Sequence, residues 1–318
     1  MYLTYLIHLT SHAKVIYFFC SRYRSSQIRC LLPDNRNPAY VSIVNDKTAW
    51  TETLNIIEVA YVVTSQPRHK FSMCLSPIFG TPSTLQDLIQ YFELNRILGA
   101  ETFLVYNYSL SLTAHNSVLQ YYTAKGLISV IQWKLPPVVA ADVWYNAQML
   151  MLLDCMYRNK GLAKYLINTD IDEFIVPVKH PSWEAYLKTK EPVCEYRIRS
   201  VVMKGRPCFS KSEDNATCMS ALHNLTRSSY IWRDKVRSKC IEEVNCLEIP
   251  GIHFTWRFRQ PDQANSVLVN VTQALVYHYR EPLSKDKSFF KDRRLQKYAS
   301  KLKTNVQSVM KSIGSSEA

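Results

Sequence analysis

Hydrophobic residues in the middle of the chain switch repeatedly between strand-like and helix-like spacing. Residues 71–80 form a short apolar run, which is typical of a buried strand. The next segment has apolar residues at steps of three and four, namely Leu85, Leu88, Ile89, Phe92 and Leu98. This spacing puts them on one side of a helix, which Gly99 would end. The pattern therefore predicts a strand, a loop and a helix.

The same unit recurs further along the chain. Residues 101–109, 127–135 and 164–169 are predicted strands, and residues 113–125 and 140–159 are predicted helices. Such alternation predicts an α/β fold with a mainly parallel sheet flanked by helices. Ligands of these sheets bind at the carboxyl ends of the strands, so Ser76, Asn107 and Asp170 are expected together at one edge as ligand-binding residues.

Three acids follow the last of these strands in the segment "TDIDEF". Asp170 and Asp172 are one residue apart, so their side chains leave the chain on the same side while Ile171 turns inward. Two carboxylates this close repel each other unless a cation lies between them. Mn²⁺ or Mg²⁺, held by the carboxylates and by substrate phosphate, fits better than Zn²⁺, because no thiolate or histidine cluster is adjacent.

An acid pair after a strand can also cap a helix or lie solvated in a turn. Its position at the end of the fourth strand of the series favours a ligand site instead. Two chemistries remain. A phosphatase of the haloacid-dehalogenase type uses the first Asp as nucleophile, but it normally has Thr or Val where this chain has Phe174. A nucleotide-sugar glycosyltransferase uses the pair to hold a metal on the donor diphosphate, and this fits better.

Five segments spread over residues 74–280 carry a resemblance to a known family. They are "CLSPIFG", "LNRILGAETFLVYN", "YYTAKGLISVIQW", "DCMYRNKGLAKYLINTDIDEFIVP" and "ALVYHYRE". In this order they resemble glycosyltransferase family 92, which consists of metal-dependent enzymes with the GT-A fold. The resemblance implies transfer of galactose from UDP-galactose to a glycan acceptor with inversion, typically in the Golgi behind a membrane anchor. An inactive, glycan-binding relative is an alternative.

The resemblance also implies roles for individual residues. Asp170 would lie near the ribose and metal, and Asp172 would bind the metal directly. The role of Glu173 is left open. His278, at the end of a late strand, is a further candidate metal ligand, and Arg280 could pair with the diphosphate through its planar guanidinium group.

Inversion requires a residue that takes the proton from the acceptor hydroxyl. The acids of the later half, Asp234, Glu242 and Glu243, are candidates, and Glu243 is the choice made from the sequence. His253 lies in the aromatic segment "PGIHFTW". It is a further candidate contact for the substrate, because sugar rings pack against aromatic side chains.

The formal net charge of +13 raises the question of nucleic-acid binding. Much of this charge lies in residues 285–311, where apolar residues recur at helical spacing: Leu295, Tyr298, Leu302, Val306 and Val309. This predicts a basic surface helix packed through its apolar side, with an anionic membrane surface as the second possibility. Nucleic acid is not expected as a partner, because no zinc-finger or RNP motif accompanies the charge.

The chain has 9 cysteines and no C-x-x-C pair. Five lie in residues 194–246, which predicts disulfides in a secretory lumen, and the odd total leaves at least one cysteine unpaired within the chain. Four Asn-x-Ser/Thr acceptors add to this, at Asn107, Asn215, Asn224 and Asn270. We therefore expect residence in the Golgi or endoplasmic reticulum lumen.

The apolar N-terminus is interrupted by His8, His12 and Lys14, so it is too short for a membrane-spanning helix. It predicts two strands, at residues 2–9 and 14–20, and any membrane association would need an anchor that is missing or degenerate here. The predicted organisation is a β-rich appendage over residues 1–70, a GT-A catalytic domain over 71–284, and a basic helix and tail over 285–318.

Overall fold

The structure is a computed structural model of the chain. It describes residues 14–18, 25–29, 39–41, 56–59, 66–80, 85–110, 113–205 and 219–314. The predicted strand at residues 2–9 and the acceptor Asn215 lie outside these ranges.

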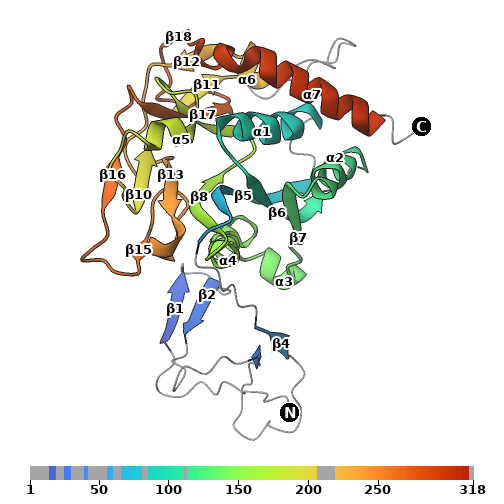
Figure 1. Ribbon diagram of the computed structural model, residues 1–318, viewed down its shortest axis with the longest axis vertical. Helices are drawn as coiled ribbons and strands as arrows, with labels where there is room; N and C mark the ends of the chain where they lie inside the picture. Colours follow the sequence, from blue (N-terminus) through green and yellow to red (C-terminus); the bar gives the residue numbers. More distant parts are fainter. Residues whose placement is uncertain are drawn as a thin grey trace, which may run out of the picture.

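The main sheet has seven strands in the order β16-β10-β13-β8-β5-β6-β7 (Figure 1). Its parallel half is formed by β5 (His69–Gly80), β6 (Thr102–Leu110), β7 (Ile128–Gln132) and β8 (Ala163–Thr169). The other half is formed by β13 (Lys239–Glu243), β10 (Glu195–Ile198) and β16 (Ser266–Leu268). Here β13 runs antiparallel to both β8 and β10. The predicted α/β fold with a mainly parallel sheet is confirmed.

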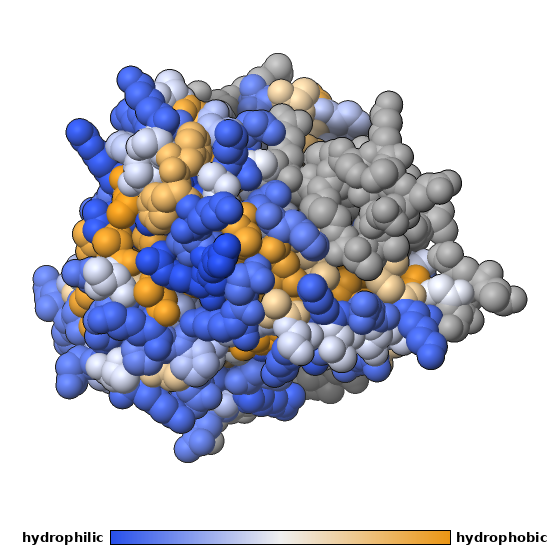
Figure 2. All heavy atoms as spheres, turned by 90° about the horizontal axis from the view of Figure 1, so that it is seen from above, coloured by the Kyte–Doolittle hydropathy of each residue, from blue (hydrophilic) through white to orange (hydrophobic). Residues whose placement is uncertain are grey.

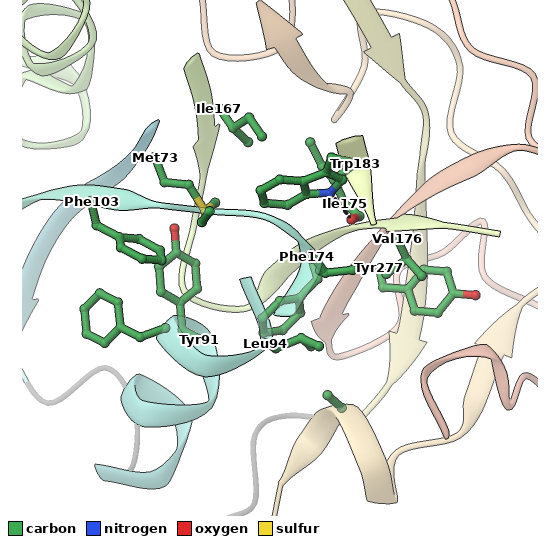
Figure 3. Packing of buried hydrophobic residues seen from close by; sticks show 14 of the residues in the cluster. Met73, Tyr91, Leu94, Phe103, Ile167, Phe174, Ile175, Val176, Trp183 and Tyr277 are labelled. Carbon is green, nitrogen blue, oxygen red and sulfur yellow. Dashed lines mark hydrogen bonds between the residues drawn. The ribbon is translucent and has the colours of Figure 1, made fainter. Parts of the chain in front are cut away.

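Helices cover both faces of this sheet (Figure 1). One face carries α1 (Leu85–Leu98), α2 (Thr113–Ala124) and α7 (Ala299–Gly314), and the other carries α4 (Gln148–Asn159). Shorter helices are α3 (Pro137–Ala140), η2 (Trp144–Ala147), α5 (Trp183–Leu187), α6 (Ser220–His223), η4 (Val244–Cys246) and η5 (Arg294–Tyr298). Large aromatic side chains fill the core beneath α1, where Tyr91 packs against Phe103 and Phe174, and Trp183 belongs to the same buried cluster (Figure 3).

A second sheet has five strands in the order β18-β12-β11-β17-β9. They are β18 (Phe289–Lys291), β12 (Thr226–Ser228), β11 (Ser200–Lys204), β17 (Ala274–Arg280) and β9 (Glu173–Pro177). Strands β9 and β17 are antiparallel, with His278 opposite Glu173. The segment after the acid pair is thus a strand, as predicted, but it belongs to a different sheet from the strand before the pair.

Three small antiparallel pairs complete the described structure. They are β1 (Lys14–Phe18) with β2 (Ser25–Arg29), β3 (Tyr40–Val41) with β4 (Ile57–Glu58), and β14 (Leu247–Ile249) with β15 (Arg257–Phe258).

The prediction of one long helix over residues 140–159 is wrong, because the helical backbone is interrupted just before α4. Tyr145, Asn146 and Ala147 are left-handed, with φ of 47°, 54° and 59°. Non-glycine residues rarely adopt this conformation, and a run of three needs support from its surroundings. The Trp133 indole supplies part of it, donating a hydrogen bond of 2.9 Å to the carbonyl of Asn146.

The C-terminal helix packs on α1, as its apolar spacing predicted. Its buried side chains are Leu302, Val306, Val309 and Ile313, while Lys301 and Lys303 are exposed. Figure 2 views the molecule from the end that carries this helix in Figure 1, and that surface is largely hydrophilic. The described part of the chain contains no helix with the length and apolar content needed to cross a membrane.

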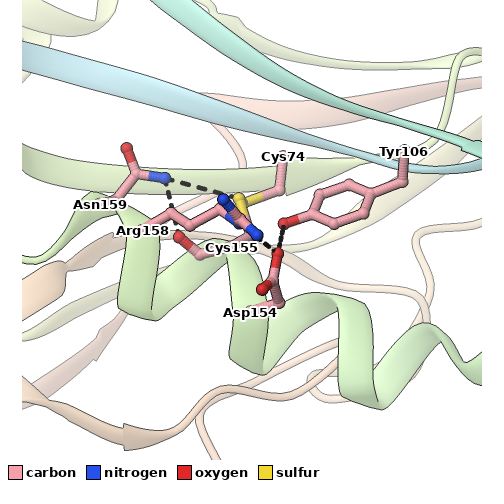
Figure 4. Close-up of a disulfide and its surroundings, with 6 residues drawn as sticks. All are labelled: Cys74, Tyr106, Asp154, Cys155, Arg158 and Asn159. Carbon is pink, nitrogen blue, oxygen red and sulfur yellow. Dashed lines mark hydrogen bonds and ion pairs between the residues drawn. A yellow bond between two sulfur atoms is a disulfide. The ribbon is translucent and has the colours of Figure 1, made fainter. Parts of the chain in front are cut away.

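Two disulfides are present among the described residues. Cys194–Cys246 confirms a disulfide within the predicted cluster, and Cys74–Cys155 joins β5 to α4. Beside the latter, Asp154 accepts hydrogen bonds from Tyr106 at 2.6 Å and Arg158 at 2.7 Å (Figure 4). Helix α4 is therefore fixed to the sheet by covalent and polar contacts. Cys240 is buried and unpaired, and the remaining cysteines lie outside the described ranges: Cys20, Cys30, Cys208 and Cys218.

Candidate active site

A cleft of about 500 Å³ opens beside the end of β8. Five residues that the sequence singled out line it together: Asp170, Asp172, His253, His278 and Arg280. The other lining residues are Trp144, Tyr145, Gln148, Arg237, Ile252 and Glu281. The cleft thus collects side chains from both sheets and from the break before α4.

Backbone hydrogen bonds hold the acid pair in a tight turn between β8 and β9. The Glu173 amide donates to the Asp170 carbonyl at 3.0 Å. The Asp170 amide donates in turn to the Glu173 carboxylate at 3.1 Å. Asp172 is tied to the second sheet, because its carbonyl accepts from the Tyr279 amide at 2.9 Å. These contacts fix where both Asp side chains leave the backbone.

His278 lies between two of the acids. Its Nε2 is 3.3 Å from Asp172 Oδ2, and its Nδ1 is 3.3 Å from Glu173 Oε1. Burial lowers the pKa of His278, but the charges of Glu173 and Asp172 outweigh it and raise the pKa above its ordinary value. The pairing of His278 with Glu173 across β17 and β9 creates this arrangement.

Lys239 is a buried cation beneath the acid pair. Its Nζ lies 3.3 Å from Asp170 Oδ2 and 3.0 Å from Glu173 Oε2, and its side chain is only 1% exposed. Burial raises the pKa of Asp170, but Lys239, helped by Ser76 and His278, outweighs this and lowers it to about 2. Asp170 is therefore ionised at every physiological pH. The sequence analysis missed Lys239, which begins the strand β13 (KCIEE) among other charged residues and therefore carries no local signal.

Asp170, Asp172 and His278 offer oxygen and nitrogen atoms of the kinds that bind divalent cations, although these atoms do not all lie within 4.8 Å of one another in the described structure. Asp170 Oδ1 is buried and meets no hydrogen-bond partner at normal geometry among the described residues, although the nearby Ser76 hydroxyl lowers the pKa of this carboxyl group. A cation or an ordered water would satisfy such an oxygen. Asp172 and His278 Nε2 add an oxygen and a nitrogen donor within the same cleft. A ligating histidine usually has its other ring nitrogen against a carboxylate, which is the position of Glu173 here.

Ser76 supports the cleft from the end of β5. Its hydroxyl is buried and accepts a hydrogen bond of 2.9 Å from Gln148, the first residue of α4. This hydrogen bond helps to place Gln148 in the cleft wall. Ser76 also lies close enough to Asp170 to lower its pKa, as expected for residues at one edge of the sheet.

Asn107 does not reach the cleft. Its side-chain oxygen accepts the backbone amide of Leu110 at 3.0 Å, so the side chain folds back onto the end of its own strand. The predicted role of Asn107 in ligand binding finds no geometric support.

Glu243 also lies away from the cleft, which corrects its expected position. Strand β13 is antiparallel to β8, and Glu243 pairs with Tyr165 near the start of β8. The same strand direction brings Lys239, at the other end of β13, to the acid pair. The two alternative acids are occupied elsewhere: Glu242 accepts from Thr255 at 2.7 Å, and Asp234 pairs with Arg197 at 3.0 Å.

His253 does line the cleft, on the loop between β14 and β15. Its Nδ1 lies 3.1 Å from the carbonyl of Ser238. Burial and the charge of Lys239 lower the pKa of His253 to about 4. The imidazole is therefore neutral near pH 7, and it can accept a proton.

The left-handed segment before α4 contributes two aromatic side chains that the sequence analysis did not assign. Trp144 is 65% exposed and Tyr145 is 51% exposed, and both line the cleft. Tyr145 packs edge-on against Phe79 at a centroid distance of 6.1 Å. Burial and the nearby Asp170 and Asp172 raise the pKa of Tyr145, so its hydroxyl stays protonated beside the acid pair.

A mainly parallel sheet with an acid pair at the end of its fourth parallel strand is consistent with a GT-A-like fold. The family model of glycosyltransferase family 92 matches residues 69–313. The chain therefore belongs to glycosyltransferase family 92.

Curated relatives agree with this assignment. The chain is 26% identical over 280 residues to the beta-1,4-galactosyltransferase galt-1 of Caenorhabditis elegans, covering 84% of this chain and 63% of that protein. It is 24% identical over 165 residues to the galactan beta-1,4-galactosyltransferase GALS2 of Arabidopsis thaliana, covering 50% of this chain and 31% of that protein. The chain thus spans less than two thirds of the length of either relative.

Proposed function

We propose that this chain transfers galactose from UDP-galactose to a glycan acceptor with inversion, using a divalent cation held by Asp170, Asp172 and His278. The observation that carries the proposal is the unpartnered Asp170 Oδ1 in the cleft that Asp172 and His278 also line. The names of the relatives, which are beta-1,4-galactosyltransferases, support galactose as the transferred sugar.

The protein side chains prepare the site in three ways. Lys239 keeps Asp170 ionised, and Glu173 holds the ring of His278 from its far side. Arg280 brings a guanidinium group to the cleft, where a planar cation suits a phosphate group. The bound Mn²⁺ or Mg²⁺ would stabilise, as a Lewis acid, the charge that develops on the departing UDP.

The acceptor hydroxyl must lose a proton during inverting transfer. With Glu243 at the far end of β13, two residues of the cleft can accept it: the carboxylate of Glu281 and the neutral imidazole of His253. We expect the Glu281→Gln and His253→Gln variants to separate them. Replacing the residue that accepts the proton should lower kcat and leave binding of the sugar-nucleotide donor unchanged.

The test is UDP release from UDP-galactose by the purified protein with Mn²⁺ and a β-galactosyl oligosaccharide acceptor. Asp172→Ala should abolish release, and Asp262→Ala, the same change at an exposed position outside the cleft lining, should not. Full activity of Asp172→Ala would refute the proposal. Release of phosphate from a phosphomonoester would favour the phosphatase alternative, and acceptor binding without any binding of UDP would favour the inactive relative.

We also propose a lumenal location in the Golgi or endoplasmic reticulum. Two disulfides support it, because such bonds persist in oxidising compartments. Asn270 adds to this, because it is an exposed asparagine in an Asn-x-Thr glycosylation sequence. It lies in a turn in which its side-chain oxygen accepts hydrogen bonds from Thr272.

A further inference from the structure

Two arginines line the cleft together, on the loop before β13 and at the end of β17. They are Arg237 and Arg280. Within the described part of the chain, no ion pair joins either guanidinium group to a carboxylate. The Nε of Arg280 is buried and lacks a hydrogen-bond partner there. The proximity of the pair has an electrostatic effect, because burial and the charge of Arg280 lower the pKa of Arg237.

Like charges on one cavity wall repel each other unless an anion lies between them. Three acids at the cleft are engaged by other cations, because Asp170 and Glu173 contact Lys239 while Asp172 contacts His278. The charges of Glu173 and Asp286 act on Arg237 without forming an ion pair with it and offset only part of the repulsion from Arg280. A negatively charged ligand would supply further counter-charge between the two guanidinium groups. Planar guanidinium groups with several donors match the oxygens of phosphate groups.

The loop that carries Arg237 is held in a strained form. Lys235 and Arg237 are both left-handed, with φ of 63° and 59°, and such strain in non-glycine residues is concentrated at functional sites. Asp234 anchors the loop through its ion pair with Arg197, and the Arg237 guanidinium stacks on the Trp232 ring at 4.9 Å. These contacts hold Arg237 in place before any ligand binds.

We propose that Arg237 and Arg280 form a two-arginine clamp for the diphosphate of the sugar nucleotide, with Arg237 selecting diphosphate over monophosphate. This inference rests on the proposed function and extends it to Arg237. This residue precedes β13, which lies in the other half of the main sheet from the parallel strands. The acid pair with its cation would hold one part of the diphosphate, and the clamp would hold another.

The test is the dissociation constant of UDP, UMP, uridine and inorganic pyrophosphate, measured by calorimetry with MnCl₂ present. Arg237→Ala should weaken UDP and pyrophosphate by about 10- to 100-fold, as expected for the loss of charge-assisted hydrogen bonds, and should change uridine less than twofold. Arg237→Lys should recover part of the loss. Arg233→Ala, at an exposed position of the same loop, should bind all four like the wild type.

Three results would overturn the clamp. They are unchanged UDP binding in Arg237→Ala, equal losses for UDP and uridine, and binding of glucuronate that depends on Arg237 while UDP binding does not. Thermal unfolding of each variant is the control for an intact fold. Wild-type protein that binds pyrophosphate through Arg237 but does not bind UDP would refute the proposed function and retain the anion site, so the two failures are distinguishable.

Discussion

A buried carboxyl group beneath the His253 loop predicts an unusual dependence of stability on pH. Glu242 is buried on β13, where its carboxyl accepts the Thr255 hydroxyl at 2.7 Å. Glu195 and the thiol of Cys240 lie in the same buried cluster. Burial raises the pKa of Glu242 to about 8, because it outweighs the opposite effect of Thr255 and is reinforced by Glu195.

The size and sign of the effect follow from proton linkage. Between its ordinary pKa of 4.5 and its folded value of about 8, Glu242 keeps its proton in the folded protein and loses it in the unfolded chain. The free energy of unfolding therefore falls as pH rises through this window, by about 1.36 kcal/mol per pH unit. Over the whole window this one group lowers the free energy of unfolding by about 5 kcal/mol.

Glu242→Gln removes the ionisation and keeps an oxygen that can accept the Thr255 hydrogen bond. We expect the variant to gain stability relative to the wild type as pH rises from 5 to 9. Urea denaturation at each pH unit measures this difference. Parallel stability profiles for the two proteins would refute the reasoning.

The same change should affect activity. Because Thr255 follows His253 in the cleft loop, activity should fall less at alkaline pH in the Glu242→Gln variant than in the wild type.

Three further changes test other parts of the account. Lys239→Met should lower the free energy of unfolding by about 3–5 kcal/mol, because it removes the cation that contacts the buried carboxylate of Glu173 and the partly exposed carboxylate of Asp170; chemical denaturation checks this, and adding Glu173→Gln should restore part of the loss. The double change Cys194→Ala and Cys246→Ala opens a link between residues 52 apart and should cost about 4 kcal/mol in the same assay; a cost below 1 kcal/mol would contradict it. In secreting cells, Asn270→Gln should remove one endoglycosidase-sensitive shift in gel mobility, and an unchanged shift would refute glycan attachment there.

Local patterns were enough to predict the parallel half of the main sheet. The spacing of apolar residues within each strand and helix is a local property, and it gave β5, α1, β6, α2, β7 and β8 in order. The position of Asp170 and Asp172 followed from the same reasoning, since acids after a parallel strand emerge at the ligand-binding edge. The left-handed residues before α4 carried no such signal, so the predicted long helix was wrong there.

Contacts between distant segments could not be predicted in this way. Lys239 reaches the acid pair because β13 enters the sheet antiparallel to β8, and this strand direction also carries Glu243 away. His278 was singled out by resemblance, but its contact with Glu173 depends on the pairing of β9 with β17 in a separate sheet. Strand order and direction, which depend on tertiary packing, therefore decided which candidates meet.

The central claim is that Asp170, Asp172 and His278 together hold a divalent cation. Electron paramagnetic resonance of free Mn²⁺, titrated into the purified protein without nucleotide or sugar, tests it most directly. We predict one bound Mn²⁺ per chain in the wild type and in the exposed control Asp262→Asn, and weakening by at least about tenfold in Asp172→Asn, as expected for the loss of a charged ligand. Equal Mn²⁺ binding by Asp172→Asn and the wild type would contradict the account.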